Sequence, residues 1–231
     1  MLVLGIETSG RTGSLALHRD GCCLDERLLN SAGSRHARGI AAYVDALLRQ
    51  SNLTAADCDA VAVSIGPGSF TGLRVGVVFA KTFAYAAGCA LTAVDTLSAV
   101  AELSPPDVSR VSVISDAQRG DLYVGRYNRS SEGAFVRQGA IQIVPASLWC
   151  ANRSADETVS GPGVDRCEAQ LTARCRVLEP VSRRPTAAVI ARLGSRRLAE
   201  QTGDDLWTLE PLYIRRSAAE EKRGADETSS G

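Results

Sequence analysis

The sequence predicts an α/β fold in which one order of strands and helices occurs twice, the second time in shortened form. Each half opens with an apolar strand, over residues 2–7 and again over residues 110–115. A hairpin follows in each half, with an Asp-Gly signal at 20–21 after the second strand of the first half and a Gly-Asp turn at 120–121 after the opening strand of the second. With 231 residues, 45% of them hydrophobic, the chain can build a buried core in one large domain or two small ones.

The elements of the first half follow from local patterns. The expected elements are strands over residues 2–7, 13–18 and 22–29, a helix over 35–50, a strand over 60–65, a helix over 71–87 and a strand over 89–94. In the first helix, apolar residues recur at helical spacing, and Ser34 is the expected N-cap. Gly88 is the expected C-cap of the second helix. Asp95 or Thr96 is expected to cap a short third helix.

The second half begins after a break at Ser-Pro-Pro-Asp, residues 104–107. The expected elements are strands over residues 110–115, 122–127 and 134–144 and a helix over 186–201 that stops at Gly203. The order strand, hairpin, strand, helix, strand therefore occurs twice. This order is the plan of the actin-like ATPase and sugar-kinase fold, a duplicated ribonuclease H-like architecture. Few residues remain after the second hairpin, so the second lobe is predicted to be reduced.

These patterns predict three segments. Residues 1–104 form an N-terminal lobe, and residues 105–216 form a smaller lobe whose last helix can pack back on the first. Residues 217–231 contain no large apolar side chain and are expected to be disordered.

Charge and cysteine content limit the functional classes. Lys and Arg number 26, as do Asp and Glu, so no basic face for autonomous RNA binding is expected. The seven cysteines contain no Cys-x-x-Cys pair, which is typical of reduced thiols in a cytosolic protein. No signal peptide and no membrane-spanning run is recognised, so a cytoplasmic location without membrane contact is expected.

A glycine-rich segment over residues 64–76 joins a strand to a helix. Such a junction can bind an anion, because a helix N-terminus offers free N–H groups. It can equally be a tight turn that only packs. Two phosphate motifs are excluded: Lys81 lies too far from Gly72 for a Walker A loop, and Thr71 replaces the last glycine of the dinucleotide fingerprint.

This segment, SIGPGSFTGLRVG, resembles the TsaB family, the dimerisation subunit of the bacterial machinery that places threonylcarbamoyl on adenosine in tRNA. Four further stretches agree in order along the chain: LVLGIETS from residue 2, SRHA from 34, DAQRGDLY from 116 and LEPLYIR from 209. The resemblance implies the actin-like fold and a TsaD-type catalytic partner. It also implies a platform for a TsaE-type ATPase, indirect contact with tRNA through the complex, and a possible homodimer when the chain is alone.

The resemblance also predicts a catalytically silent subunit without a cofactor. TsaD-type enzymes carry His-x-x-x-His after the strand that follows the glycine segment, and two imidazoles at that spacing can bind one metal ion. Thr96 and Val100 stand at those positions here, and His18 and His36 are the only histidines in the chain. A histidine metal site is therefore not expected.

In TsaB-like proteins two helices pair with helices of TsaD. The resemblance therefore predicts a partner-binding surface on the two matching helices of this chain. The nominated residues are Ile40, Tyr43, Val44, Leu47, Leu73, Arg74, Val77, Val78 and Lys81. Arg74 and Lys81 are the preferred partner-facing candidates, because a buried charge needs a partner. The alternative interpretation places many of these side chains in the core of the chain.

Two acids support a different hypothesis, a small kinase or ATPase that uses magnesium. Glu7 and Asp116 each follow the first strand of their lobe, where active members of the fold hold phosphates and metal. The alternative is that each acid accepts N–H bonds from its own turn.

Overall fold

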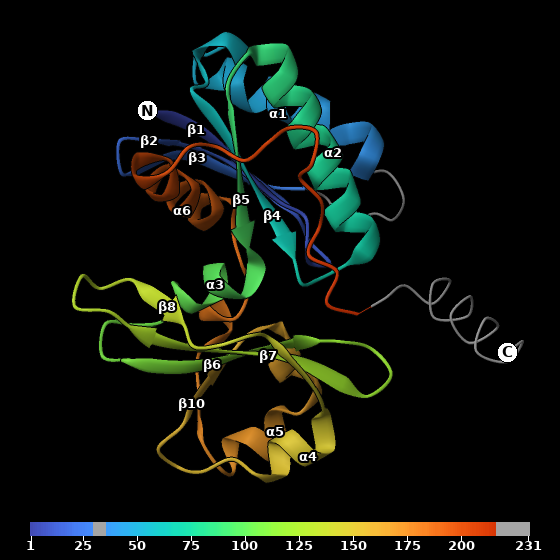
Figure 1. The fold of residues 1–231 in the computed structure, drawn as a ribbon, viewed down its shortest axis with the longest axis vertical. Helices are drawn as coiled ribbons and strands as arrows, with labels where there is room; N and C mark the ends of the chain where they lie inside the picture. Colours follow the sequence, from blue (N-terminus) through green and yellow to red (C-terminus); the bar gives the residue numbers. More distant parts are fainter. Residues whose placement is uncertain (30–35, 216–231) are drawn as a thin grey trace, which may run out of the picture.

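The chain forms two lobes, each built on a β-sheet (Figure 1). The computed structural model describes residues 1–29 and 36–215, and for residues 36–38 it describes the backbone alone. The expected N-cap Ser34 and the tail over 217–231 lie outside the described residues, as do the histidine side chain at 36 and residues 34–35 of the SRHA stretch.

The first sheet has the strand order β3-β2-β1-β4-β5. Its strands are β1 (Leu2–Glu7), β2 (Ser14–Arg19), β3 (Cys22–Leu28), β4 (Ala60–Gly66) and β5 (Ala90–Asp95). The first three strands are antiparallel neighbours, and β4 and β5 run parallel to β1. The predicted hairpin is present, since Asp20 and Gly21 both have positive φ between β2 and β3.

Helices cover both faces of this sheet. The helices are α1 (His36–Gln50), α2 (Phe70–Ala87) and α6 (Ala187–Glu200). Leu4 and Ile6 of β1 pack into the cluster that contains α1 and α2, whereas Val3 packs with α6. At Gly5 a Cβ would lie 2.2 Å from the carbonyl oxygen of Ala187, so this glycine lets α6 approach the sheet.

The ends of α2 and the next helix agree with the sequence. Gly88 is the C-cap of α2, in the left-handed conformation with φ of 67°. Asp95 is the N-cap of α3 (Thr96–Ala101) and accepts from the N–H of Ser98 at 2.8 Å. Gly88 was the expected C-cap, and Asp95 is one of the two residues expected to cap the third helix.

The second sheet has the order β11-β10-β6-β7-β8, with β9 paired to β7. Its strands are β6 (Arg110–Asp116), β7 (Asp121–Arg129), β8 (Phe135–Arg137), β9 (Gln142–Pro145), β10 (Thr158–Ser160) and β11 (Arg176–Val177). Two short helices, α4 (Ala146–Ala151) and α5 (Glu168–Thr172), pack with its core. The prediction of one strand over 134–144 is wrong: β8 and β9 are separate, because the chain turns at Gly139 with φ of 78°.

Three short 3₁₀ helices complete the described elements. They are η1 (Ala55–Asp57), η2 (Pro162–Arg166) and η3 (Pro180–Ser182). Among the residues that the structure describes, no helix has the length and apolar character needed to cross a membrane.

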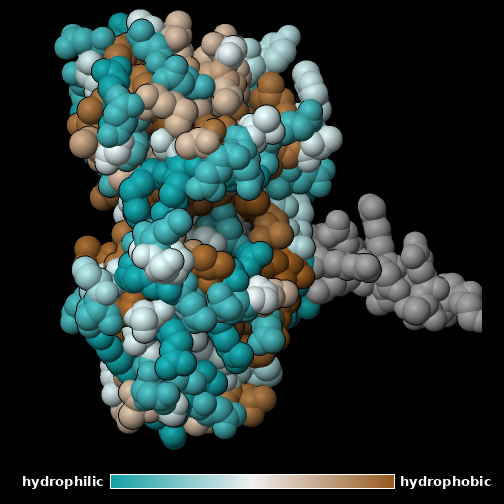
Figure 2. Space-filling model, turned by 60° about the vertical axis from the view of Figure 1, so that its left-hand side comes forward, coloured by the Kyte–Doolittle hydropathy of each residue, from teal (hydrophilic) through white to brown (hydrophobic). Residues whose placement is uncertain are grey.

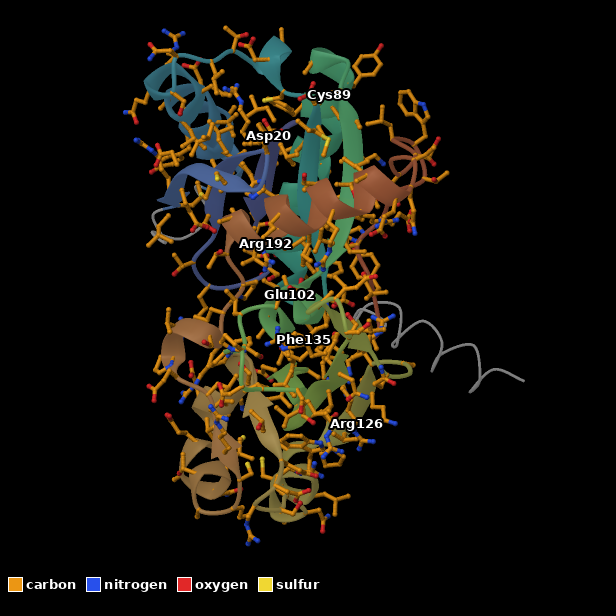
Figure 3. The ribbon with its side chains drawn as sticks, turned by 90° about the vertical axis from the view of Figure 1, so that its left-hand side faces the viewer. Asp20, Cys89, Glu102, Arg126, Phe135 and Arg192 are labelled. Atoms are coloured by element: carbon orange, nitrogen blue, oxygen red, sulfur yellow. The ribbon has the colours of Figure 1, made fainter. Side chains whose placement is uncertain are left out.

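The lobes meet at α3, which contacts β4 and β5 on one side and β6, β7 and β8 on the other. One side of the molecule narrows between the lobes (Figure 2). There Glu102, at the end of α3, lies between Arg192 of α6 and Phe135 of β8 (Figure 3). Its carboxylate accepts from the Phe135 N–H at 2.9 Å and pairs with Arg192 at 3.4 Å and Arg196 at 3.0 Å. A largely buried acid therefore joins elements of both lobes.

Candidate partner-binding surface

The glycine-rich segment packs against the turn that follows β1. A Cβ at Gly72 would lie 2.0 Å from the carbonyl oxygen of Thr8, and a Cβ at Gly76 would lie 2.2 Å from the Thr8 hydroxyl. The N–H of Ser69 donates to the carbonyl of Ser9 at 2.7 Å. The space beside the start of α2 is thus filled by the chain's own turn, which explains these glycines by close packing.

Glu7 is buried at the end of β1. Its Oε1 accepts from the N–H and from the hydroxyl of Ser9, both at 2.5 Å. Its Oε2 is fully buried and has no hydrogen-bond partner among the described residues. Burial raises the pKa of Glu7 above its usual value, although the hydrogen bonds from Ser9 act in the opposite direction.

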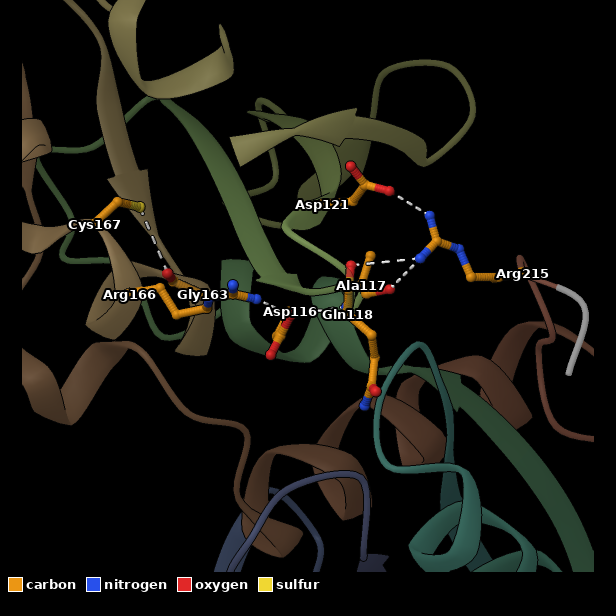
Figure 4. A network of polar contacts seen from close by, with 8 residues as sticks. All are labelled: Asp116, Ala117, Gln118, Asp121, Gly163, Arg166, Cys167 and Arg215. Atoms are coloured by element: carbon orange, nitrogen blue, oxygen red, sulfur yellow. Dashed lines mark hydrogen bonds and ion pairs between the residues drawn. The ribbon is translucent and has the colours of Figure 1, made fainter. Parts of the chain in front are cut away.

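Asp116 lies in a different setting, at the half-exposed end of β6. Its Oδ1 accepts from the N–H of Gln118 at 2.8 Å and pairs with Arg166 at 2.5 Å (Figure 4). The contacts described for Glu7 and Asp116 share no residue. Among residues 1–29 and 36–215, no group of three His, Cys, Asp or Glu side chains is placed to hold a metal ion.

A segment after α6, which we call the C-terminal strap (residues 204–215), runs back along α2 (Figure 1). The Nζ of Lys81 donates to the carbonyls of Trp207 and Leu209, each at 3.2 Å. The N–H of Leu212 donates to the carbonyl of Ile65 at 2.7 Å. The strap is therefore attached both to the middle of α2 and to the end of β4.

Near the start of α2 the strap forms an aromatic and cationic cluster. The guanidinium of Arg74 lies 3.9 Å from the ring centroid of Phe70, and its Nε donates to the Tyr213 hydroxyl at 2.9 Å. The rings of Phe70 and Tyr213 are 5.3 Å apart. This geometry is that of a cation–π contact reinforced by a hydrogen bond, on a surface that is open to solvent.

Large apolar side chains of α2 and the strap gather on this surface. We call them the α2 ridge: Phe70, Val78, Tyr85, Trp207 and Tyr213. Val78, Tyr85 and Trp207 have 63%, 70% and 77% of their surface exposed. Tyr85 and Trp207 also contact each other edge to face, with centroids 6.1 Å apart. Contiguous exposed aromatic and aliphatic side chains are typical of protein interfaces.

Comparison with known proteins identifies the family. The model of the family described as TsaD, tRNA N6-adenosine threonylcarbamoyltransferase, matches residues 30–143. The Bacillus subtilis tRNA threonylcarbamoyladenosine biosynthesis protein TsaB is 29% identical over 229 residues, covering 96% of this chain and 97% of that protein. The chain belongs to the TsaB (YeaZ-like) family.

Solved structures agree with this TsaB assignment. A Pseudomonas aeruginosa protein described as similar to the peptidase YeaZ superposes with a TM-score of 0.78 at 25% identity, covering 93% of this chain and 99% of that one. The ROK hexokinase of Thermus thermophilus superposes with a TM-score of 0.51 at 10% identity, covering 87% of this chain and all of that one. The predicted actin-like ATPase and sugar-kinase fold is confirmed.

The predicted partner-binding residues of this TsaB-family chain divide by burial. Five of them are in the core of the first lobe: Ile40, Val44, Leu47, Leu73 and Val77. Side chains buried to this degree already pack against the sheet and against each other, so they follow the alternative interpretation in being core, and their contact with a partner stays a prediction. Tyr43 is half-buried beside the same core, and Val78 is exposed.

The two preferred charged candidates have partners within the chain. Lys81 donates to strap carbonyls and Arg74 donates to the Tyr213 hydroxyl, so neither charge requires an external partner, and contact of these two residues with a partner stays a prediction. Phe70, Tyr85, Trp207 and Tyr213 were not among the residues predicted from the sequence. A signal was available for two of the ridge residues, since Phe70 and Val78 lie two i, i+4 steps apart on one side of α2, with Arg74 between them. The strap contribution had no such signal.

Proposed function

We propose that this chain acts in tRNA threonylcarbamoyladenosine biosynthesis as a subunit that pairs with a TsaD-type catalytic subunit. Membership of the TsaB family supports the pathway, and the B. subtilis relative carries that pathway in its name. The match of residues 30–143 to the TsaD family supports the partner. Two subunits of one fold can present equivalent surfaces to each other, as the subunits of a two-fold dimer do.

The observation that carries the proposal is the α2 ridge. It places three side chains with at least 63% exposure, Val78, Tyr85 and Trp207, on one surface of the first lobe. Covering such side chains with a partner removes apolar area from water, at about 25 cal/mol per Å². Aromatic side chains are also enriched among residues that dominate binding energy. The ridge is therefore the surface we assign to the TsaD-type partner.

We further propose that the chain is catalytically silent. The two positions that carry histidine in TsaD-type enzymes hold Thr96 and Val100, and both are buried. Thr96 uses its hydroxyl to accept from the Gly66 N–H at 3.1 Å, a structural role between β4 and α3. The chain would then act by setting the conformation of its partner and by helping to form a platform for a TsaE-type ATPase. Contact with tRNA would be indirect, through the assembled complex.

The experiment is reconstitution of tRNA modification from purified subunits. The TsaD-type and TsaE-type subunits, tRNA, ATP with magnesium and threonylcarbamoyl adenylate as the group donor are combined with and without this chain, and threonylcarbamoyl on the adenosine next to the anticodon is measured. We expect modification to require the chain, and a stable complex with the TsaD-type subunit to form on gel filtration. Full modification without the chain, or elution of only its homodimer in the presence of the partner, would contradict the proposal.

The alternative is a small kinase or ATPase that uses Glu7, Asp116 and magnesium. This alternative has less support, because one carboxylate oxygen of Glu7 already accepts from Ser9 and Asp116 already forms an ion pair with Arg166. Calorimetry of the isolated chain with ATP and magnesium separates the two hypotheses. Tight binding and turnover that are lost in Asp116→Ala would favour the enzyme.

A further inference from the structure

The C-terminal strap ends on the second lobe, at the turn between β6 and β7 (Figure 4). The Nη1 of Arg215 donates to the carbonyls of Ala117 at 2.8 Å and Gln118 at 3.4 Å. Its Nη2 pairs with the carboxylate of Asp121. A guanidinium presents several donors in one rigid plane, so one side chain holds both the main chain and the acid of this turn.

The turn that Arg215 holds has an unusual backbone. Gln118, Arg119 and Gly120 have positive φ values of 66°, 53° and 89°. Left-handed conformation costs free energy in residues other than glycine, so external donors that satisfy the carbonyls help to maintain the turn. On its other side, Arg166 of the same lobe pairs with Asp116. The turn is therefore held from two sides, by its own lobe and by the strap.

The same strap is attached to the α2 ridge immediately before Arg215. Tyr213, two residues earlier, accepts from Arg74 and packs on Phe70. Only Ile214 separates Tyr213 from Arg215, and two residues reach at most about 7 Å, so the ridge contact and the turn contact are close neighbours along the chain. A displacement of Tyr213 therefore bears directly on the hold of Arg215.

We propose that the strap couples occupancy of the α2 ridge to the hold of the first lobe on the β6–β7 turn of the second lobe. This inference rests on the proposed function, because it assigns a consequence to partner binding at the ridge. A partner that covers Phe70 and Tyr213 excludes water from the Arg74–Tyr213 hydrogen bond and strengthens it. A restrained Tyr213 limits the motion of Arg215, and the turn is held more tightly. By reciprocity, a tightly held turn favours the ridge conformation that binds the partner.

The first test uses amide hydrogen exchange on the isolated full chain. Tyr213→Phe removes the hydroxyl that accepts from Arg74, and Arg215→Ala removes the contact with the turn. We expect both changes to raise exchange of the amides in residues 117–121 by about threefold or more, since local opening becomes easier. The matched control is Arg166→Ala, which removes the other guanidinium from the same turn. It should raise exchange in 117–121 but leave the Leu212 amide, which donates to Ile65, as in the wild type.

The informative result is the exchange of the turn in Tyr213→Phe. If the amides of residues 117–121 exchange as in the wild type, a change at the ridge does not alter the turn through the strap, and the proposal is overturned. Circular dichroism monitors folding of each variant. Arg215→Lys retains the charge without the planar fork and should give exchange between those of wild type and Arg215→Ala.

The second test adds the TsaD-type subunit. We expect the partner to slow exchange of residues 117–121 in the wild type and to have no such effect in Arg215→Ala. Binding of the partner to both wild type and Arg215→Ala, with equal slowing of amide exchange in residues 117–121, would overturn the coupling. If the partner does not bind the wild type at all, the proposed function fails, whereas the test on the isolated chain still decides whether the strap transmits.

Discussion

Arg74 donates from Nε to the hydroxyl of Tyr213 at 2.9 Å, although 139 residues separate them in the chain. This bond joins the first turns of α2 to the last described residues of the strap. It turns a helix face into a composite surface, in which ridge residues from both segments lie together. A partner that recognises α2 therefore also meets the strap.

Neighbouring valines on α2 test which face of the helix is free. Val77 has 3% of its surface exposed and Val78 has 63%. We expect Val77→Asp to destabilise the fold by about 3 kcal/mol or more, because it buries an unpaired charge. Val78→Asp should change the free energy of unfolding by less than about 0.5 kcal/mol and weaken binding of the TsaD-type subunit at least about tenfold. Denaturant unfolding and a binding titration measure the two effects.

The control for Val78→Asp is Val136→Asp, on β8 of the second lobe. Val136 is 52% exposed and lies outside the ridge, so its replacement should leave partner binding unchanged. Equal binding by wild type and Val78→Asp would show that the ridge is not the interface.

Glu7 predicts a pH dependence of stability. Burial raises the pKa of Glu7 in the folded chain above the ordinary value of 4.5. The folded chain therefore keeps the Glu7 proton to a higher pH than the unfolded chain does. The contribution of this protonation to the free energy of unfolding is complete below about pH 4.5 and is lost as pH rises through the raised pKa. Glu7→Gln cannot ionise, so its stability relative to wild type should increase over that interval and then level off.

Denaturant unfolding of both proteins at a series of pH values measures this difference. Glu132→Gln, at an exposed position between β7 and β8, is the control. A constant difference between Glu7→Gln and wild type from pH 4 to pH 8 would mean that Glu7 ionises freely in the folded chain.

Gly72 predicts the cost of adding one methyl group to the start of α2. A Cβ there would lie 2.0 Å from the Thr8 carbonyl, whereas a Cβ at Gly10 would meet nothing nearer than 3.6 Å. We expect Gly72→Ala to destabilise the fold by about 1–3 kcal/mol, since backbone must shift to relieve the overlap. Gly10→Ala should stay within about 0.5 kcal/mol of wild type. Thermal unfolding compares them, and similar melting temperatures would refute close packing as the role of Gly72.

Substitutions of Glu102 measure how much the contact between the lobes contributes to the free energy of unfolding. Glu102→Ala removes the acceptor for the Phe135 N–H and for two arginines of α6. We expect a loss of about 1–3 kcal/mol, the cost of leaving a donor unpaired near the junction. Glu102→Gln keeps an acceptor for the Phe135 N–H and should lose less. Denaturant unfolding of the three proteins orders them, and a fully stable Glu102→Ala would show that the contact is dispensable.

The sequence by itself determined the order of the elements in the first lobe and most of their ends, but not the short elements between β7 and α6. Asp-Gly at 20–21 turns the first hairpin, Gly88 ends α2 and Asp95 begins α3, because these residues act through their own backbone and immediate neighbours. The family was also readable from short stretches in order along the chain.

Only the tertiary structure decided which side chains form the surface. Val77 and Val78 look alike in sequence, and their burial depends on how α2 is rotated against the sheet. Arg74 and Lys81 appeared to need an external partner, but the strap supplies the acceptors from more than 120 residues away. Hydrogen bonds and packing between distant segments leave no periodic pattern in the sequence, so the α2 ridge and the hold of Arg215 on the second lobe emerged only from the fold.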